Sequence, residues 1–305
     1  MIRIPGLRRP PAPRLSYAAD KDSRRKRAFI ALVERLTGQR RIIRIYNETR
    51  KVLGPDDDVW ALAVQALGIN VVYDGSHLAR APSEGPLVVV ANHPFGMVDG
   101  LVLCHLIATV RPDLKVMAMS TLCRLPEIQR YVLPIDFSGT REAAAMSAQS
   151  RRAARRHLEA GGAVIVFPAG AVSTSLKPFQ PAVDGAWHPF VGRLVQQARA
   201  DVLPVRFQGQ NSPMFQIASR LNPTLRLSLL MKEAADRIGT TVTANIGEVQ
   251  PFDSLRHLGD PQALADHLRA VTYNIAVQPV LPRRRLRRRP QSAAAAAIRD
   301  RQFPY

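Results

Sequence analysis

A histidine and an aspartate stand six residues apart at the end of a strongly apolar stretch. His93 follows the run Val-Val-Val-Ala at residues 88–91, and Asp99 opens an apolar helical pattern. Pro94 and Gly96 lie between them and favour a turn. The turn can bring the Asp99 carboxylate to one imidazole nitrogen of His93, which would hold the tautomer and make the other nitrogen more basic. We therefore predict that the pair acts as a general base, which is worth roughly 10²–10⁴ in rate.

Two other interpretations of these residues remain open. His93 could be a structural histidine and Asp99 a helix cap, because a carboxylate is favoured in the first turn of a helix. A metal site is less favoured, because no further cluster of His, Cys or Asp has ligand spacing, and we predict none. The two cysteines, Cys104 and Cys123, show no C-x-x-C pattern. They suit a reducing compartment and are predicted to be buried packing residues.

The chain is strongly basic. Its 305 residues include 43 Lys and Arg against 24 Asp and Glu, a formal net charge of +19, and only six of the basic residues are Lys. Such a balance indicates an acidic partner: an anionic membrane surface, nucleic acid, an acidic carrier protein or a phosphate-bearing substrate. The basic N-terminus lacks the apolar core of a secretory signal, and no apolar run reaches the roughly 18–20 residues that span a bilayer. We therefore expect any contact with a membrane to be at its surface.

Short apolar segments alternate with helical patterns along most of the chain. Several of the short segments are continuous apolar runs, as in strands of a sheet that is covered on both faces. The order predicts an α/β fold with a mixed, largely parallel sheet covered by helices, after an N-terminal amphipathic helical segment. The expected strands are residues 69–74, 87–91, 115–120, 131–136, 163–167, 202–208, 225–230 and 241–248, and the expected helices include 56–68, 99–110, 142–160, 189–200 and 261–277.

Composition divides the chain into four parts. We predict a disordered basic tail over residues 1–22, a helical membrane-surface segment over 23–68, the α/β domain over 69–277 and an Arg-rich flexible tail over 278–305. The run at 282–290 alone carries six arginines. Basic residues near an anionic membrane are attracted to it, so we expect both ends to hold the protein there.

The N-terminal helical segment has its own start, break and apolar face. Ser23 is the candidate N-cap, and Gly38 is the candidate break between two helices. The apolar face either packs on the domain or lies on a membrane with arginines among the headgroups, and the two are compatible. Its residues are Phe29, Ile30, Val33 and Leu36.

Four segments together resemble one family. NHPFGMVDG, which holds His93 and Asp99, resembles the first block of the glycerolipid acyltransferase family, the lysophosphatidate acyltransferase-like enzymes. That block is N-H-x4-D, and the spacing here is one residue longer, which is similar to the hemolysin-like and lyso-ornithine lipid acyltransferase-like branch. VIVFPAGAVS resembles the F-P-E-G block, VLPIDFSGTREA resembles the block whose Arg holds the acceptor's phosphate, and VLPVRFQG resembles the fourth block. The blocks follow family order over residues 86–208.

The resemblance implies an O-acyltransferase of membrane lipid biosynthesis. It would move a fatty acyl group from an acyl thioester, acyl-ACP or acyl-CoA, to a hydroxyl of a lysolipid, either a lysophospholipid or a lyso-ornithine lipid. His93 would be the base and Asp99 its orienting partner, and neither a protein nucleophile nor a cofactor beyond the acyl donor is required. The other residues that it implies are Arg141, Gly170 and Ser173 for binding the acceptor, with Gly96 and Gly170 for positioning or for the oxyanion.

The chain departs from the family in the F-P-E-G block. Ala169 replaces the Glu that helps to position a glycerol-phosphate acceptor, so we predict that lysophosphatidate is a poor substrate beside another lysolipid. Arg206 is a further candidate to face the acceptor. In the segment DGAWHPF and just beyond it, His188 and Arg193 are the only basic candidates for a phosphate contact, and Trp187 with His188 is predicted to pack as a helix entry.

The partners expected from this interpretation are a lysolipid, an acyl carrier protein or CoA thioester, and an anionic membrane surface. We predict a peripheral protein on the cytoplasmic face of the membrane. The alternative from another class is a non-catalytic basic protein that binds membrane or nucleic acid. Aromatic residues are only 6% of the chain, and there is no RNA-recognition motif or zinc finger, so we expect no nucleic acid partner.

Overall fold

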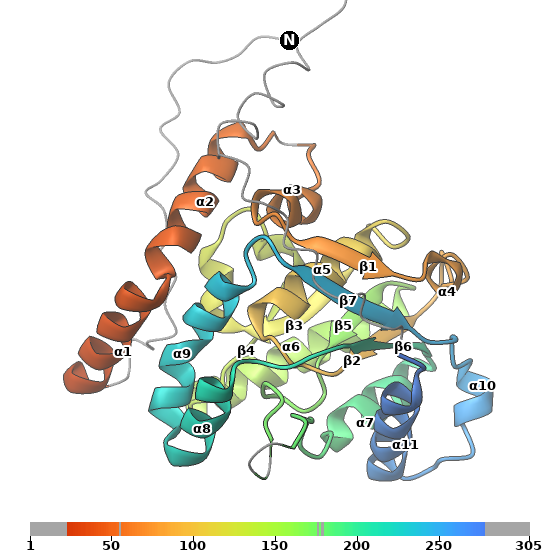
Figure 1. Ribbon diagram of the computed structural model, residues 1–305. Helices are drawn as coiled ribbons and strands as arrows, with labels where there is room; N and C mark the ends of the chain where they lie inside the picture. The colour runs from red at the N-terminus through yellow and green to blue at the C-terminus, as the bar shows by residue number, and fades with distance from the viewer. Residues whose placement is uncertain (1–22, 55, 176, 178–179, 278–305) are drawn as a thin grey trace, which may run out of the picture.

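The structure is a computed structural model that describes residues 23–54, 56–175, 177 and 180–277. Its strands are β1 Asn70–Tyr73, β2 Leu87–Ala91, β3 Lys115–Met119, β4 Val132–Ile135, β5 Ala163–Val166, β6 Asp201–Phe207 and β7 Thr241–Ile246. They form one seven-stranded sheet in the order β1-β7-β6-β2-β5-β3-β4 (Figure 1). The strands β2 to β6 run parallel, and β7 pairs antiparallel with β6 and parallel with β1. The prediction of a mixed, largely parallel sheet is confirmed.

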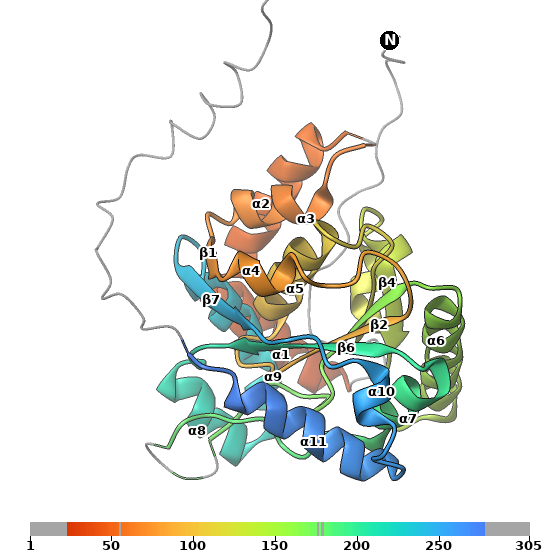
Figure 2. The ribbon, with the colours of Figure 1, turned by 90° about the vertical axis from the view of Figure 1, so that its right-hand side faces the viewer.

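Helices cover both faces of this sheet. They are α1 Arg24–Thr37, α2 Gln39–Val52, α3 Val59–Ala66, α4 Gly75–Leu78, α5 Met97–Ala108, α6 Arg141–Glu159, α7 Pro189–Ala198, α8 Pro213–Leu221, α9 Pro223–Asp236, α10 Phe252–Leu255 and α11 Pro261–Asn274. Leu87, Val89 and Ala91 of β2 join a core with α2, α3, α5 and α9, whereas Val88 and Val90 join a core with α6, α7 and α11. Figure 2 shows α7 and α11 together on one side of the sheet. Because both faces of β2 are covered, its sequence is a continuous apolar run.

The chain leaves β2 and β5 toward opposite edges of the sheet. From β2 it passes through α5 to β3, and from β5 it passes through α7 to β6 on the other side of β2. Since β2 and β5 are neighbours, the strand order reverses between them. In open α/β sheets the ligand crevice lies at such a reversal, outside the carboxyl ends of the strands. The residues that follow β2 and β5 therefore occupy the expected site.

The start and the break of the N-terminal helices are as predicted. The Ser23 hydroxyl accepts the backbone N–H of Lys26 at 3.3 Å and caps α1. Gly38, with a φ of +130°, separates α1 from α2. A Cβ at Gly38 would overlap the side chain of Ala235 in α9, so this position needs glycine both for its backbone and for the close approach.

These helices pack on the sheet domain rather than standing apart from it. Ile42 of α2 and Trp60 of α3 belong to the same buried core as the sheet. The predicted apolar face of α1 is divided, because Ile30 is fully buried whereas Phe29 is 44% and Leu36 is 75% exposed. One part of the face thus holds the helix in place, and the other part remains open.

The strand predicted at residues 225–230 is wrong, because the segment lies within α9. The segment alternates Leu with Arg226 and Ser228, as a half-buried strand does, but the helix start lies just before it. The Asn222 side chain accepts the N–H groups of Thr224 and Leu225, which caps the helix, and Pro223 occupies its first position. The helix packs against α1 and α8, which gives it apolar neighbours on two sides.

The other expected helices and strands are present with shifts of a few residues at their ends. The predicted tails at residues 1–22 and 278–305 lie outside the described residues. Within the described ranges, no helix is both long and apolar enough to cross a membrane.

Candidate active site

Three adjacent strands are tied together at their carboxyl ends, where His93 lies. Asn92, which follows β2, bonds both backbone groups of Phe207 in β6, at 3.0 and 2.7 Å. The His93 ring packs on the ring of Phe167, which follows β5, with the two centroids 4.2 Å apart. The Ser173 N–H donates to the His93 carbonyl oxygen at 2.8 Å. His93 is therefore held between β5 and β6, at the reversal of the strand order.

The turn after β2 brings His93 and Asp99 together. Nδ1 of His93 lies 3.1 Å from Oδ2 of Asp99, without the alignment of a straight hydrogen bond, as is common before a substrate binds. The same Oδ2 accepts the backbone N–H groups of Phe95 at 2.7 Å and Gly96 at 3.0 Å. Gly96, with a φ of +72°, is the N-cap of α5. Asp99 therefore both caps α5 and faces His93, so the capping interpretation and the pairing interpretation are both correct about its position.

Burial differs sharply between the two partners. The Asp99 side chain is fully buried, and the His93 side chain is 19% exposed. Burial raises the pKa of Asp99 above the usual carboxyl range, while His93 and the two backbone donors act in the opposite direction. Oδ1 of Asp99 has no hydrogen-bond donor among the described residues, and Nδ1 of His93 is buried. The exposed part of the imidazole is thus the edge that carries Nε2, and this nitrogen is available as a base.

Asp184, which the sequence analysis did not single out, holds the His93 backbone from the loop before α7. It is 2% exposed. Its Oδ1 accepts the His93 N–H at 3.1 Å and the Ser173 hydroxyl at 2.5 Å, and its Oδ2 accepts the Trp187 indole N–H at 3.0 Å. Its backbone N–H donates to the hydroxyl of Tyr273 in α11 at 2.7 Å. No motif in the sequence predicts this cluster, because its members come from distant segments.

Three of the residues predicted to bind the acceptor or the oxyanion instead make hydrogen bonds within the protein. The Ser173 side chain is 1% exposed and its hydroxyl is committed within the protein, so it does not fit the acceptor-binding role. The N–H of Gly96 donates to Asp99, and the N–H of Gly170 donates to the Phe167 carbonyl at 3.0 Å. Neither N–H is free for an oxyanion. With φ values of +72° and +66°, both glycines instead shape the two turns of the site.

The backbone after Gly170 offers other donors. The N–H groups of Ala171 and Val172 donate to no acceptor within the part of the chain that the structure describes. A Cβ built on Gly96 would lie 3.3 Å from the Val172 side chain, so this segment lies against the turn that carries the dyad. These two N–H groups are therefore the candidate oxyanion donors.

The remaining candidates lie around the rim. Arg141 begins α6 and is exposed. Arg206 donates to two backbone carbonyls at the end of α11, at 2.5 and 3.0 Å, so the prediction that it faces the acceptor is wrong. Trp187 is fully buried and His188 is the N-cap of α7, which confirms the predicted helix entry. Arg193 is exposed on α7, on the side that faces α6.

Arg226, in the first turn of α9, is a cation near the site that the sequence analysis missed. It is half-buried, its guanidinium donates to the Val172 carbonyl at 2.6 Å, and no carboxylate pairs with it in the described ranges. Burial lowers the pKa of Arg226. Leu230, one turn further along α9, would lie 3.6 Å from a Cβ on Gly96, so this helix face borders the turn of the dyad. A guanidinium has five N–H donors, and a partly desolvated one is stabilised by an anion.

The cysteines show no sign of a nucleophile. Cys104 is 1% exposed, as predicted, and Cys123 is half-buried rather than buried. Burial raises the pKa of both thiols, which disfavours the reactive thiolate. Among the described residues, no three His, Cys, Asp or Glu side chains converge as metal ligands.

Known proteins resemble this chain in sequence and structure. The family model described as Acyltransferase matches residues 32–243. The chain is 26% identical over 210 residues to a lyso-glycine lipid O-acyltransferase of Phocaeicola vulgatus, with 65% of this chain and 71% of the relative covered. It is 23% identical over 256 residues to a lyso-glycine lipid O-acyltransferase of Bacteroides thetaiotaomicron, with 81% and 89% covered. Among solved structures, the 1-acyl-sn-glycerophosphate (LPA) acyltransferase PlsC of Thermotoga maritima aligns with a TM-score of 0.46 and 18% identity, over 81% of this chain and 86% of that one.

Proposed function

The chain belongs to the acyltransferase family and is an O-acyltransferase, and we propose that it moves a fatty acyl group from a thioester to the hydroxyl of a lysolipid with an amino-acid headgroup. One observation carries this proposal: the His93–Asp99 pair at the reversal of the strand order, with one imidazole edge facing a buried carboxylate and the other exposed. Such a pair suits the removal of a proton from an acceptor hydroxyl.

The transfer needs one proton and no enzyme-bound intermediate. Nε2 of His93 takes the acceptor's hydroxyl proton while the hydroxyl oxygen attacks the thioester carbon, and Asp99 stabilises the imidazolium. The carbonyl oxygen becomes an oxyanion, to which the N–H groups of Ala171 and Val172 donate. Collapse of this adduct re-forms the carbonyl C=O bond and breaks the C–S bond. The proton on His93 then passes to the leaving thiolate, so that an ester and a thiol are released.

Two observations support an amino-acid headgroup over glycerol phosphate, and a third is compatible with it. Ala169 stands where the family carries a Glu that helps to position glycerol phosphate, and its side chain makes no hydrogen bonds. Two relatives are named for a lyso-glycine lipid. The compatible observation is that Arg226 has donors left beside the site, since a guanidinium binds a carboxylate through two parallel bonds, as it also binds a phosphate. An amino acid that is linked to the lipid through its nitrogen keeps such a carboxylate.

A panel of acceptors tests the proposal. Purified protein with one acyl thioester should favour lyso-glycine lipid or lyso-ornithine lipid over lysophosphatidate and lysophosphatidylcholine, by about tenfold or more in kcat/KM. Arg226→Gln should lower kcat/KM for the amino-acid lysolipids by roughly tenfold, mainly through KM, because one bidentate charged contact is lost. The matched control is Arg220→Gln, whose side chain bonds Ser175 at 3.2 and 3.0 Å from the end of α8.

Two results would contradict it. A preference for lysophosphatidate would contradict the proposed amino-acid headgroup of the acceptor. If no acceptor is acylated from either acyl-ACP or acyl-CoA, the non-catalytic binding protein becomes the better interpretation.

We also propose that the protein works as a peripheral protein on anionic lipid, at the cytoplasmic face of the membrane. Two helices, α1 and α8, pack on α9 (Figure 1). Both carry exposed apolar side chains. Amphipathic helices of this kind bind at the headgroup boundary. Replacing the two exposed leucines of α1, Leu32 and Leu36, by Ser should weaken vesicle binding roughly tenfold and leave activity on detergent-dispersed lipid unchanged. Equal binding to neutral and anionic vesicles would count against this. The side chains are Phe29, Leu32 and Leu36 on α1 with Met214, Ile217 and Leu221 on α8.

A further inference from the structure

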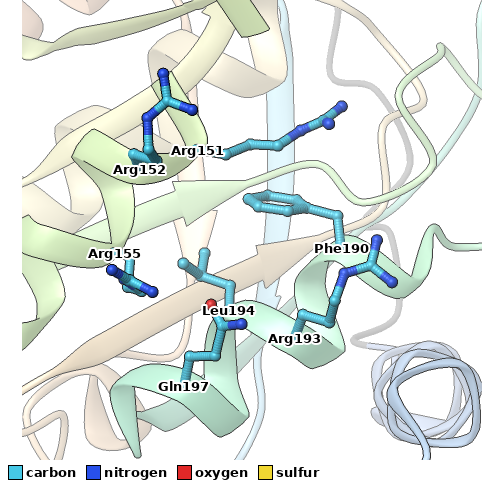
Figure 3. Close-up of a pocket in the computed structure, with 7 residues that line it drawn as sticks. All are labelled: Arg151, Arg152, Arg155, Phe190, Arg193, Leu194 and Gln197. Atoms are coloured by element: carbon cyan, nitrogen blue, oxygen red, sulfur yellow. The ribbon is translucent and has the colours of Figure 1, made fainter. Parts of the chain in front are cut away.

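A shallow groove lined by arginines runs between α6 and α7. Four arginines border it, three from α6 and one from α7, with Phe190 and Leu194 at its base (Figure 3). The α7 residues on it recur every three or four positions, so the groove follows the helix along its length. The arginines are Arg151, Arg152, Arg155 and Arg193.

The charge of this groove is only partly neutralised. Arg155 pairs with Glu159 at 3.3 Å on the same helix, and Arg151 lies over the Phe190 ring, 5.3 Å from its centroid. Arg152 and Arg193 are exposed and have no carboxylate partner within the described ranges. Two guanidinium groups, one on each wall, are therefore open to an acidic partner.

The groove leads toward the dyad. Arg151 also lines a second cavity of about 250 Å³, which includes Phe137 after β4. A Cβ built on Gly170 would lie 3.5 Å from the Phe137 ring and 3.8 Å from His188, two residues before Phe190. Gly170 belongs to the turn that follows Phe167, on which His93 packs. Successive contacts therefore connect the groove, by way of Phe137 and Gly170, with the turn on which His93 packs.

We propose that this groove is the docking surface for an acidic acyl carrier protein, which delivers the acyl chain on a phosphopantetheine arm. The inference rests on the proposed acyl transfer and names its donor. The acidic surface of the carrier meets Arg152 and Arg193, and the arm follows the cavity beside Phe137 until its thioester reaches His93.

The shape of the groove favours a protein over a nucleotide such as the ADP portion of CoA. Its volume of about 190 Å³ is smaller than the roughly 300–1,000 Å³ of pockets that enclose small molecules. Its single aromatic ring is already covered by Arg151. An open row of guanidinium groups instead suits a charged protein surface, where complementary charges steer association.

The groove also differs from the surface expected to meet a membrane. The exposed apolar side chains of α1 and α8 have no counterpart here apart from half-buried Phe190. Figure 2 shows α8 and α6 at opposite sides of the molecule. A carrier protein could therefore dock while α1 and α8 face the lipid.

The test compares two donors that carry the same acyl chain, acyl-ACP and the short thioester acyl-N-acetylcysteamine. In the full-length variant Arg152→Glu/Arg193→Glu, we expect KM for acyl-ACP to rise about tenfold or more, with kcat changed less than twofold, because charges at the rim of an interface act mainly on association. Transfer from the short thioester should not change, since that donor has no carrier surface.

A matched control is the variant Arg40→Glu/Arg44→Glu. Both residues are exposed on α2, without a carboxylate partner in the described ranges, so the variant makes the same change of net charge away from the groove. It should keep the wild-type KM for acyl-ACP when the acceptor is dispersed in detergent.

Each contrary outcome is distinct. An unchanged KM for acyl-ACP in the groove variant overturns the proposal, as does an equal loss with both donors or with the control variant. If wild-type protein uses acyl-CoA alone, and the groove variant has a higher KM for acyl-CoA, the groove binds nucleotide phosphates. The proposal that it binds an acyl carrier protein is then wrong. If wild-type protein transfers from no thioester, the proposed function itself fails.

Discussion

The His93–Asp99 pair and the arginine groove both consist of ionisable side chains, but the protein holds them in opposite ways. Asp99 is fully buried, and its Oδ2 meets two backbone N–H groups and the imidazole. Arg152 and Arg193 are exposed and meet no carboxylate in the described part of the chain. The first arrangement is enclosed by groups of the protein itself, and the second is open to solvent.

This difference predicts two kinds of response to change. A buried charge depends on every donor around it, so a small alteration has a large effect. Exposed charges are solvated and screened, and each contributes little by itself. Changes at the dyad should therefore act on the chemical step, and changes at the groove should act on donor binding and respond to salt.

The largest expected effect is that of His93→Ala. Transfer should fall by roughly 10²–10⁴ with either donor, because the general base is lost. The fold should persist, since the side chain is partly exposed and at a strand end. The rate should be measured at saturating donor and acceptor, with circular dichroism as the control. Transfer at the wild-type rate would exclude the dyad from the mechanism.

Asp99→Asn should lower kcat by roughly 10–10², because the orienting partner of a histidine is weakened while the shape is kept. KM for both donors should stay within about twofold of the wild-type value. A rise in KM without loss of kcat would place Asp99 in binding rather than in orientation of the base.

The same variant should also change how stability depends on pH. Because the pKa of Asp99 is raised in the folded protein, its stabilising contribution is complete below the unfolded pKa of about 3.9 and is lost as the pH rises through the folded value. The buried Asp99 carboxyl group therefore contributes less stability above the unfolded pKa than below it, and the Asn side chain does not titrate. The gain in melting temperature over wild type should be larger at pH 8 than at pH 4.5. A gain independent of pH would argue against this account.

Salt should separate the two regions without any mutation. Raising ionic strength from roughly 0.05 to 0.5 M should lower kcat/KM for acyl-ACP about three- to tenfold. At the higher ionic strength the Debye length is shorter, so the two charged surfaces attract each other over a smaller distance as they associate. Transfer from the short thioester, which depends on the buried dyad, should change little. If kcat/KM depended equally on salt with both donors, the salt response would not distinguish the groove from the dyad.

The smallest expected effect is that of Ser173→Ala. The buried Asp184 would lose one donor, which should lower the free energy of unfolding by about 1–3 kcal/mol and kcat by only a few-fold. KM for the acceptor should stay constant, because the Ser173 side chain is 1% exposed. A marked rise in that KM would restore the acceptor-binding role that the sequence indicated.

Much of the fold could be predicted because its signals are local. The apolar run of β2 reports burial on both faces, and the Ser23 cap and the Gly38 break lie within a few residues of the helices that they delimit. The failure at residues 225–230 has a local cause as well. Residues 225–230 alternate Leu with Arg226 and Ser228, as a half-buried strand does, whereas the cap and proline that start the helix lie just before the segment.

For the candidate site, the sequence alone determined the dyad, since His93 and Asp99 are separated by one turn whose glycine and proline bring them together. Only the tertiary structure decided what surrounds them. Asp184, Ser173 and Arg226 come from segments 80 to 133 residues away from His93. The first two contact His93, and Arg226 contacts the neighbouring Val172, only through the order of the strands and the packing of α9. The arginine groove likewise needs α6 and α7 side by side. Short-range geometry can be read along a chain, whereas contacts between distant segments depend on the free energy of the whole packed core.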